Sequence, residues 1–111
     1  MSRDPAYLLD ILQESRLVLT FVEGIDQPTF DADLLRQHDV IRSIEIIGEA
    51  ARRLSDEFRL AHPEIPWKLI IGMRNILVHQ YDDIKLDVVW SVLHNEIPIL
   101  IEQIAPWLAD Q

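Results

Sequence analysis

The sequence predicts an all-α fold, an up-down bundle of four main helices plus a short helix, and three observations lead to that prediction. The chain has only 3 glycines in 111 residues. Apolar residues recur at spacings of three and four, as they do along one face of a helix. The β-branched residues form no alternating apolar–polar runs of the kind that strands show. A chain of this length is expected to form a single domain over residues 1–111.

The first long helix is expected from about Pro5 to Val22, because proline suits the first turn of a helix. Residues 24–33, which contain Pro28 and three aspartates, are expected to form a loop. The apolar stripe of this helix consists of Tyr7, Leu8, Ile11, Leu12, Val18, Leu19 and Val22.

The second helix is expected from Asp33, a good N-cap, to about Leu54. Ser55 is expected to cap a short helix over residues 56–61, and two prolines in residues 62–66 then break the chain. The core face of the second helix consists of Val40, Ile44, Ile47, Ala51 and Leu54. A nearly opposite polar face consists of Arg42, Glu45, Glu49, Arg52 and Arg53.

The third helix is expected to begin at Pro66 or Trp67 and to end at Asp82-Asp83, which would also cap the fourth helix. It is apolar in every direction, and such helices are normally buried. The fourth helix is expected over residues 86–107, where Pro98 would cost about 3 kcal/mol in an unbent helix and so predicts a kink or a break. The apolar stripe of the fourth helix consists of Val89, Leu93, Ile97, Leu100 and Ile104.

Composition limits the classes of function. The net charge of −9, with only 10 basic residues, argues against a general nucleic-acid or DNA binder. Residues 34–80 are close to neutral, however, so an anion could dock there. The chain has no cysteine, which excludes disulfides and thiolate metal sites. It shows neither a signal peptide nor a long uncharged stretch, so a cytoplasmic protein without membrane association is expected.

The segment from Gly72 to Tyr81 places four polar residues at the end of the apolar third helix. Burying an arginine or a charged imidazole is unfavourable without a partner, so these residues indicate an ion-pair network or an active site. Asn75 and His79 lie four apart on one face, whereas Arg74 lies about 140° from His79 around a straight helix. Convergence of Arg74 and His79 therefore needs either fraying of the helix or two copies of it facing each other.

Structural explanations compete with a catalytic one. Arg74 could form an ion pair with Glu45 or Glu49, and the same two acids could instead orient Arg74 within an active site. His79 could simply interact with the helix dipole, and Tyr81 could be a core aromatic residue. A metal site formed by His79, Asp82 and Asp83 is disfavoured, because Arg74 would repel the cation. The remaining histidines, which are expected at the surface, are His38, His62 and His94.

The segment Arg74-Asn75-Ile76-Leu77-Val78-His79-Gln80-Tyr81 fits the R-x4-H-x-Y motif of the HEPN superfamily. The chain most closely resembles the HepT-like toxins, which are encoded beside a minimal nucleotidyltransferase (MNT) antitoxin. The resemblance covers nearly the whole chain and includes residues 42–51, 62–67, 71–75, Trp90 and 95–98.

This resemblance implies a metal-independent endoribonuclease that acts as a homodimer and needs no cofactor. Arg74 and His79 would be the catalytic pair, with Asn75 in support. The chain would be the toxin of a type VII-like toxin–antitoxin pair, and the antitoxin would silence it by attaching AMP to Tyr81. The toxin would be a homodimer, on its own or within a larger complex with the antitoxin. RNA would be the substrate, with tRNA as one candidate.

The chemistry of these residue types agrees with that function. Histidine is the side chain whose pKa suits proton transfer near neutral pH, and arginine can stabilise charge on a phosphorane. One alternative is a non-catalytic subunit that binds nucleotide or regulates a minimal nucleotidyltransferase. A plain structural dimer is the other.

Overall fold

The structure is a computed structural model, and it describes the backbone of residues 3–79 and 85–109 and the side chains of residues 3–73 and 85–108. Every regular element among these residues is a helix, so the predicted all-α class is confirmed. In chain order the elements are α1 (Asp4–Val22), α2 (Gln27–Asp31), α3 (Leu34–Arg53), α4 (Asp56–Ala61), α5 (Trp67–His79), α6 (Leu86–Ser91), a π-helical turn (Val92–Glu96) and α7 (Ile97–Ala109).

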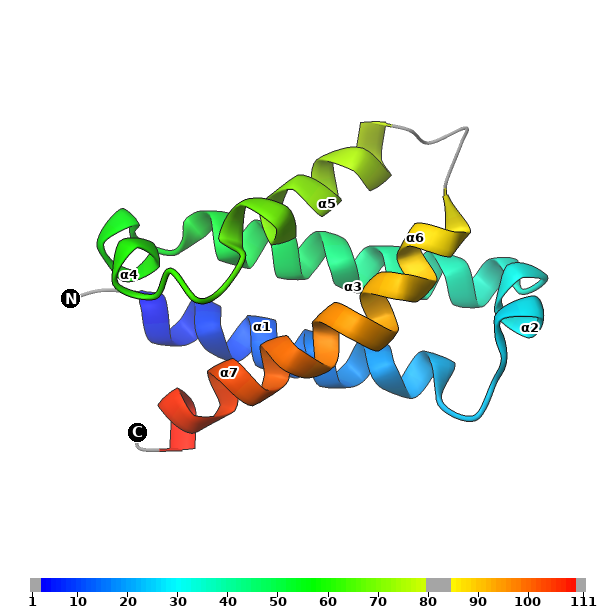
Figure 1. The fold of residues 1–111 in the computed structure, drawn as a ribbon, viewed down its shortest axis with the longest axis horizontal. Helices are drawn as coiled ribbons and strands as arrows, with labels where there is room; N and C mark the ends of the chain where they lie inside the picture. Colours follow the sequence, from blue (N-terminus) through cyan, green and yellow to red (C-terminus); the bar gives the residue numbers. More distant parts are fainter. Residues whose placement is uncertain (1–2, 80–84, 110–111) are drawn as a thin grey trace.

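Four long segments form the bundle, as the sequence predicts. α1 packs along α3, α5 packs on α3, and α7 packs on α1. The segment made of α6, the π-helical turn and α7 corresponds to the predicted fourth helix. This segment and α5 run in opposite directions across the pair formed by α1 and α3 (Figure 1).

The core contains the apolar stripes that the sequence predicts. Every residue of the predicted α3 and α6–α7 stripes is buried, and on α1 only Tyr7 and Leu19 remain partly exposed. Burial of each large apolar side chain contributes about 1.5–3 kcal/mol, so these stripes supply most of the force that holds the helices together. Among the described residues, no helix combines the length and the apolar content that crossing a bilayer requires.

The predicted helix caps are confirmed at both ends of the α3 region. The Asp33 carboxylate accepts a hydrogen bond from the backbone N–H of Arg36 at 3.1 Å, and Ser55 Oγ accepts one from that of Phe58 at 3.1 Å. The side chain of Asp4 holds this second cap, because Ser55 Oγ donates to it at 2.7 Å. The start of α1 is thereby tied to the start of α4.

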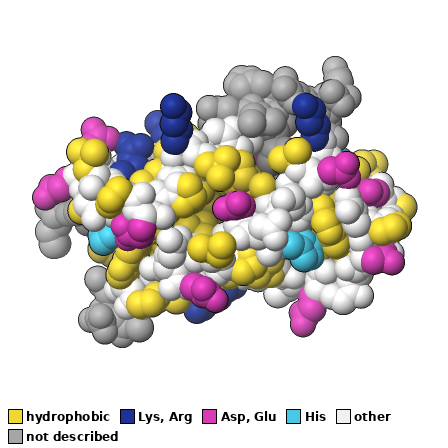
Figure 2. Space-filling model, viewed as in Figure 1, with side chains coloured by type: hydrophobic (Ala, Val, Ile, Leu, Met, Phe, Trp, Pro, Cys, Tyr) yellow, Lys and Arg dark blue, Asp and Glu magenta, His cyan; other side chains and the backbone are white. Residues whose placement is uncertain are grey.

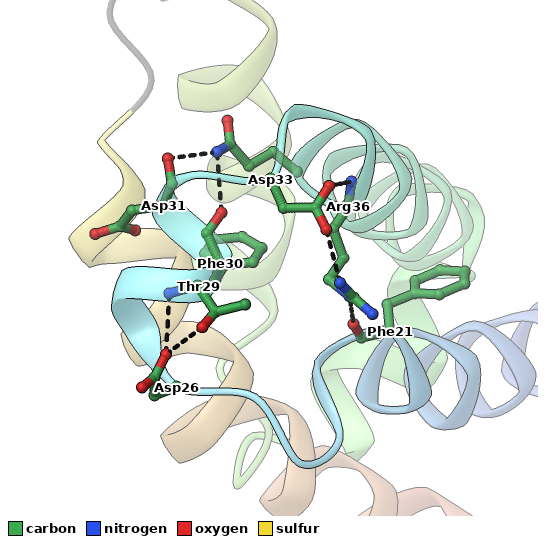
Figure 3. A network of polar contacts seen from close by, with 8 residues as sticks. Phe21, Asp26, Thr29, Phe30, Asp31, Asp33 and Arg36 are labelled. Atoms are coloured by element: carbon green, nitrogen blue, oxygen red, sulfur yellow. Dashed lines mark hydrogen bonds and ion pairs between the residues drawn. The ribbon is translucent and has the colours of Figure 1, made fainter.

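The prediction of a loop over residues 24–33 is wrong in part, because this segment contains the short helix α2. Asp26 caps that helix by accepting a hydrogen bond from the backbone N–H of Thr29 at 3.0 Å. The Gln37 amide then donates to the carbonyl oxygens of Phe30 and Asp31, each at 3.0 Å (Figure 3). A single helical turn is too short to show a periodic pattern, which is why the sequence does not reveal it.

The expected break at Pro98 is present and takes the form of a π-helical turn. The N–H of Ile97, just before the proline, bonds to the carbonyl of Val92 five residues earlier. Because Pro98 has no N–H of its own, a wider turn before it lets the helix continue into α7. The apolar stripe stays buried on both sides of this turn.

Candidate active site on helix α5

The start of α5 is anchored by the break that precedes it. The indole Nε1 of Trp67 donates a hydrogen bond to the carbonyl of His62 at 3.0 Å, and its backbone N–H bonds to the carbonyl of Ile65 at 2.8 Å. Ile65 itself is buried. These contacts fix the rotation of α5 about its axis, and hence the direction in which each later position faces.

One face of α5 is buried, and the opposite face is open. Trp67, Ile70 and Met73 are 7%, 4% and 6% exposed. Leu69, by contrast, is 48% exposed, and Lys68 is exposed as well. The expectation that this helix is buried all round is therefore wrong for its described side chains, because α5 packs on α3 from one side only.

The predicted catalytic positions fall on these two different faces. The side chains of residues 74–79 lie outside the described set, but the helical register assigns each position to a face. Arg74 follows buried Ile70 by four residues and continues the buried stripe. Asn75 and His79 follow Gly72 by three and seven residues and continue the outward stripe.

The backbone does not bring positions 74 and 79 together within one chain. α5 remains an α-helix through His79, so five residues separate the two positions by about 140° of rotation. Of the two routes to convergence, fraying of the helix before His79 is thus not observed. The other route, two facing copies of α5, stays a prediction.

Tyr81, Asp82 and Asp83 lie outside the described residues, so the roles predicted for Tyr81 and for the two aspartates stay predictions. The part of the chain that the structure describes contains no group of three or more side chains suited to hold a metal ion.

Glu45 and Glu49 lie in the wall of a cleft of about 360 Å³ between α1 and α3. Glu49 binds two arginines of its own helix. Its Oε1 accepts a hydrogen bond from Arg52 Nη2 at 2.6 Å and another from Arg53 Nε at 2.9 Å. These ion pairs lie along the polar face of α3 that the sequence predicts. Pairing of either acid with Arg74 stays a prediction. The cleft is lined by Tyr7, Asp10, Arg42, Glu45, Ile46, Glu49, Ala50 and Arg53.

These ion pairs shift the ionisation of Glu49. Hydrogen bonds first from Arg52 and then from Arg53 lower the pKa of the Glu49 carboxyl from 4.5 to about 2. The same carboxylate raises the pKa of both guanidinium groups above the ordinary value. Glu49 is therefore ionised at any physiological pH.

The three remaining histidines are not alike. His38 and His94 are exposed, as predicted. His62 is half-buried, with its ring centroid 4.4 Å from that of Phe58 and 4.3 Å from that of Trp107. The prediction of a surface position is wrong in part for His62, because the aromatic rings of α4 and α7 enclose it.

Sequence reasoning missed a groove of about 710 Å³ between α4 and α5. It depends on the position of α4, which the break at residues 62–66 sets and which periodicity cannot predict. The one signal in the sequence is the spacing of Lys68, Gly72, Asn75 and His79 along a single helix face. The groove is lined by Asp56, Arg59, Leu60, Trp67, Lys68, Ile71 and Gly72.

Comparison with known proteins covers nearly all of this chain. The family model described as Ribonuclease HepT-like matches residues 11–106. The protein named "Putative RNase MJ1380" of Methanocaldococcus jannaschii is 36% identical over 99 residues, which cover 89% of this chain and 91% of that protein. "Putative RNase TTE0752" of Caldanaerobacter subterraneus subsp. tengcongensis is 41% identical over 98 residues, or 88% of either chain.

A third relative carries a more specific name. "Probable ribonuclease HepT" of Thermococcus cleftensis is 38% identical over 94 residues, which cover 85% of this chain and 86% of that protein. No solved structure matches the chain. The similarity therefore rests on sequence, and it extends over almost the full length of these three relatives.

We predict that Glu49→Gln lowers the free energy of unfolding at neutral pH. The difference in this free energy between the variant and the wild type should shrink in acid. The carboxyl has its ordinary pKa of 4.5 in the unfolded chain and a pKa of about 2 in the folded chain. Its contribution to the free energy of unfolding is thus fully present above about pH 5 and is lost as the pH falls from there toward 2.

Urea unfolding at about pH 7, 5 and 3 measures this effect. Glu102→Gln, an equal charge change at an exposed site of α7, is the control. The prediction would be contradicted if Glu49→Gln changed the free energy of unfolding by the same amount at the highest and at the lowest pH.

Proposed function

This chain belongs to the HepT-like family, and from that premise we propose that it is a metal-independent endoribonuclease with Arg74 and His79 as its catalytic pair. The observation that carries the proposal is the R-x4-H-x-Y sequence at the end of a helix whose described outward face is open to solvent. The ribonuclease names of its relatives, which match almost the full chain, support the same activity.

The proposed reaction uses the RNA's own 2′-hydroxyl as the nucleophile. His79 removes the proton from this hydroxyl, whose oxygen bonds to the adjacent phosphorus. The bond from phosphorus to the 5′-oxygen breaks, and that oxygen takes a proton from water and leaves as a hydroxyl. The proton held on His79 then neutralises the hydroxide that this transfer leaves. Arg74 stabilises the negative charge that develops on the phosphorane oxygens, with Asn75 in support. The products are a 2′,3′-cyclic phosphate and a 5′-hydroxyl.

The active unit in this proposal is a homodimer with the α5 helices facing each other. Positions 74 and 79 point in different directions from one α5, so a second copy supplies the missing group. A seam between α5 and α7 offers apolar contact for such pairing. Leu69 is 48% exposed there and Ile99 is 52% exposed, beside buried Met73 and Ile97. Figure 2 shows hydrophobic side chains on this face of the molecule.

The same proposal includes control by a minimal nucleotidyltransferase, the antitoxin of a type VII-like pair. The Tyr81 oxygen would attack the α-phosphorus of ATP, so that AMP is transferred and pyrophosphate leaves. Because Tyr81 follows His79 by two residues, AMP attached to it would place a bulky anion where the substrate phosphate must bind. It would compete for Arg74 and close the site, in a dimer or in a larger complex with the antitoxin.

We predict that His79→Ala and Arg74→Ala each lower RNA cleavage by at least about 100-fold, the usual effect of removing a general acid–base group or a charge-stabilising donor. Cleavage of bulk tRNA by the wild type should persist in excess EDTA, leave 2′,3′-cyclic phosphate ends and fail on all-deoxy substrates. Matched surface variants, Arg16→Ala and His38→Ala, should cut as the wild type does.

Two results would contradict this mechanism. Equal cleavage of 2′-deoxy substrates would exclude attack by the 2′-hydroxyl. If the wild type and both motif variants bind the nucleotidyltransferase alike and none cuts RNA, the chain is a regulatory subunit of that enzyme instead.

We further predict that AMP is added to Tyr81. After incubation with the nucleotidyltransferase and ATP, the intact mass of the wild type should rise by whole AMP units and its ribonuclease activity should fall. Tyr81→Phe should gain no AMP and stay active. Because the chain has 2 tyrosines, Tyr7→Phe is the matched control and should be modified normally. AMP on Tyr81→Phe would contradict the assignment.

A further inference from the structure

The groove between α4 and α5 has no part in the chemistry described above. We propose that it binds the stretch of single-stranded RNA next to the scissile phosphate, with Lys68 contacting a backbone phosphate and the apolar floor contacting a base. This inference rests on the proposed ribonuclease function and assigns the substrate contacts that the motif residues leave open. At about 710 Å³ it is roomier than the cleft of about 360 Å³ between α1 and α3.

The groove has a mainly apolar floor and a basic rim. Leu60 on α4 is 80% exposed, and Ile71 on α5 is half-buried. An exposed leucine of this kind, next to a second apolar side chain, offers a surface on which the flat face of a base can rest. Contacts of this type tolerate any base, because every base has an apolar face.

The charge of the groove is opposite to that of the whole chain. Lys68 forms no ion pair with any described residue. Arg59 Nη2 binds Asp56 at 2.5 Å, while its Nε has no hydrogen-bond partner among the described residues. With two cations and one acid, the groove carries a net positive charge in a protein of net charge −9. In Figure 2, basic and acidic side chains both stand toward the left end of the molecule, where Figure 1 places α4 and the start of α5.

The groove lies in line with the predicted catalytic histidine. Lys68 and Gly72 are four residues apart, and the same face of α5 continues through positions 75 and 79. At a rise of about 1.5 Å per residue, Gly72 is about 10 Å from position 79 along the axis. A strand whose phosphate sits at His79 would pass over Gly72 and reach Lys68 within a few nucleotides.

Gly72 leaves room for such a strand. A Cβ placed on this residue would meet no other atom within 4 Å, so nothing inside the described chain requires a glycine there. Glycine in the middle of a helix lowers helix stability relative to alanine. Its presence is explained if something outside the chain approaches the backbone closely at this point.

Charge favours RNA over a protein partner as that occupant. An apolar helix from another protein would gain little from a lysine at the rim. A polyanion with flat apolar bases matches both the rim and the floor. A protein occupant would also leave the affinity for RNA independent of Lys68.

The test measures binding of a fluorescein-labelled single-stranded RNA dodecamer by anisotropy, in the non-cleaving His79→Ala background and at several salt concentrations. Lys68→Gln should weaken RNA binding. It should also make the plot of log association constant against log salt concentration less steep by about 0.7, the value for one phosphate contact on a single strand. Arg16→Gln, the same charge change at an exposed site on α1, should leave the slope unchanged.

Gly72→Leu and Gly72→Ala form the second pair of variants. Leucine should fill the groove and weaken binding by about tenfold, within the range for losing one base contact. Alanine adds a single methyl group at the same point, so it should weaken RNA binding less than leucine does, and it should raise the melting temperature, since it favours the helix. Size-exclusion chromatography reports whether either variant changes the oligomeric state.

In the cleaving protein, Lys68→Gln should raise KM for RNA and leave kcat unchanged. Unchanged RNA affinity in both Lys68→Gln and Gly72→Leu would overturn the groove assignment while leaving the ribonuclease proposal intact. Loss of a dimer in Gly72→Leu, with no effect of Lys68→Gln, would overturn it in favour of a contact between copies. Lys68-dependent binding without any cleavage would support the groove and contradict the ribonuclease proposal.

Discussion

The packing of one face of α5 on α3 is the constraint on which the account of this protein depends. Trp67, Ile70 and Met73 are buried in that contact, and their burial fixes which positions of α5 face outward. The same register that continues buried Ile70 to Arg74 turns His79 to the opposite face. Positions 74 and 79 are separated by about 140° around this helix, so one α5 does not direct both positions at the same phosphate. In the proposed mechanism a second chain is therefore needed to bring the two groups together.

This geometry also explains how an acidic chain could act on RNA. Its acids are spread over the surface, and on α3 Glu49 is engaged by two arginines of its own helix. The outward face of α5 differs, because it combines a glycine, the position of the histidine and a lysine that pairs with no acid among the residues that the structure describes. Affinity for a polyanion can then be local, confined to one helix face and the groove beside it, while the net charge suppresses binding elsewhere.

The fold followed from the sequence wherever a pattern extended over several turns. The stripes on α1, α3 and α7, the caps at Asp33 and Ser55 and the interruption near Pro98 were all predictable, because each depends on neighbours along the chain. The exposure of Leu69 was not predictable, because the sequence of an apolar helix does not show how many of its sides other helices will pack against. The groove at Lys68 depends on where α4 lies in space, which a local pattern in the sequence does not set.

The claim that the two catalytic groups come from different chains is tested most directly by mixing inactive subunits. Arg74→Ala and His79→Ala are co-expressed with different affinity tags, and the mixed dimer is purified through both. If Arg74 of one chain acts with His79 of its partner, one of the two composite sites is intact and about half of the wild-type activity returns. If both groups act within one chain, each subunit lacks one of them and the mixed dimer stays inactive, which would contradict the account.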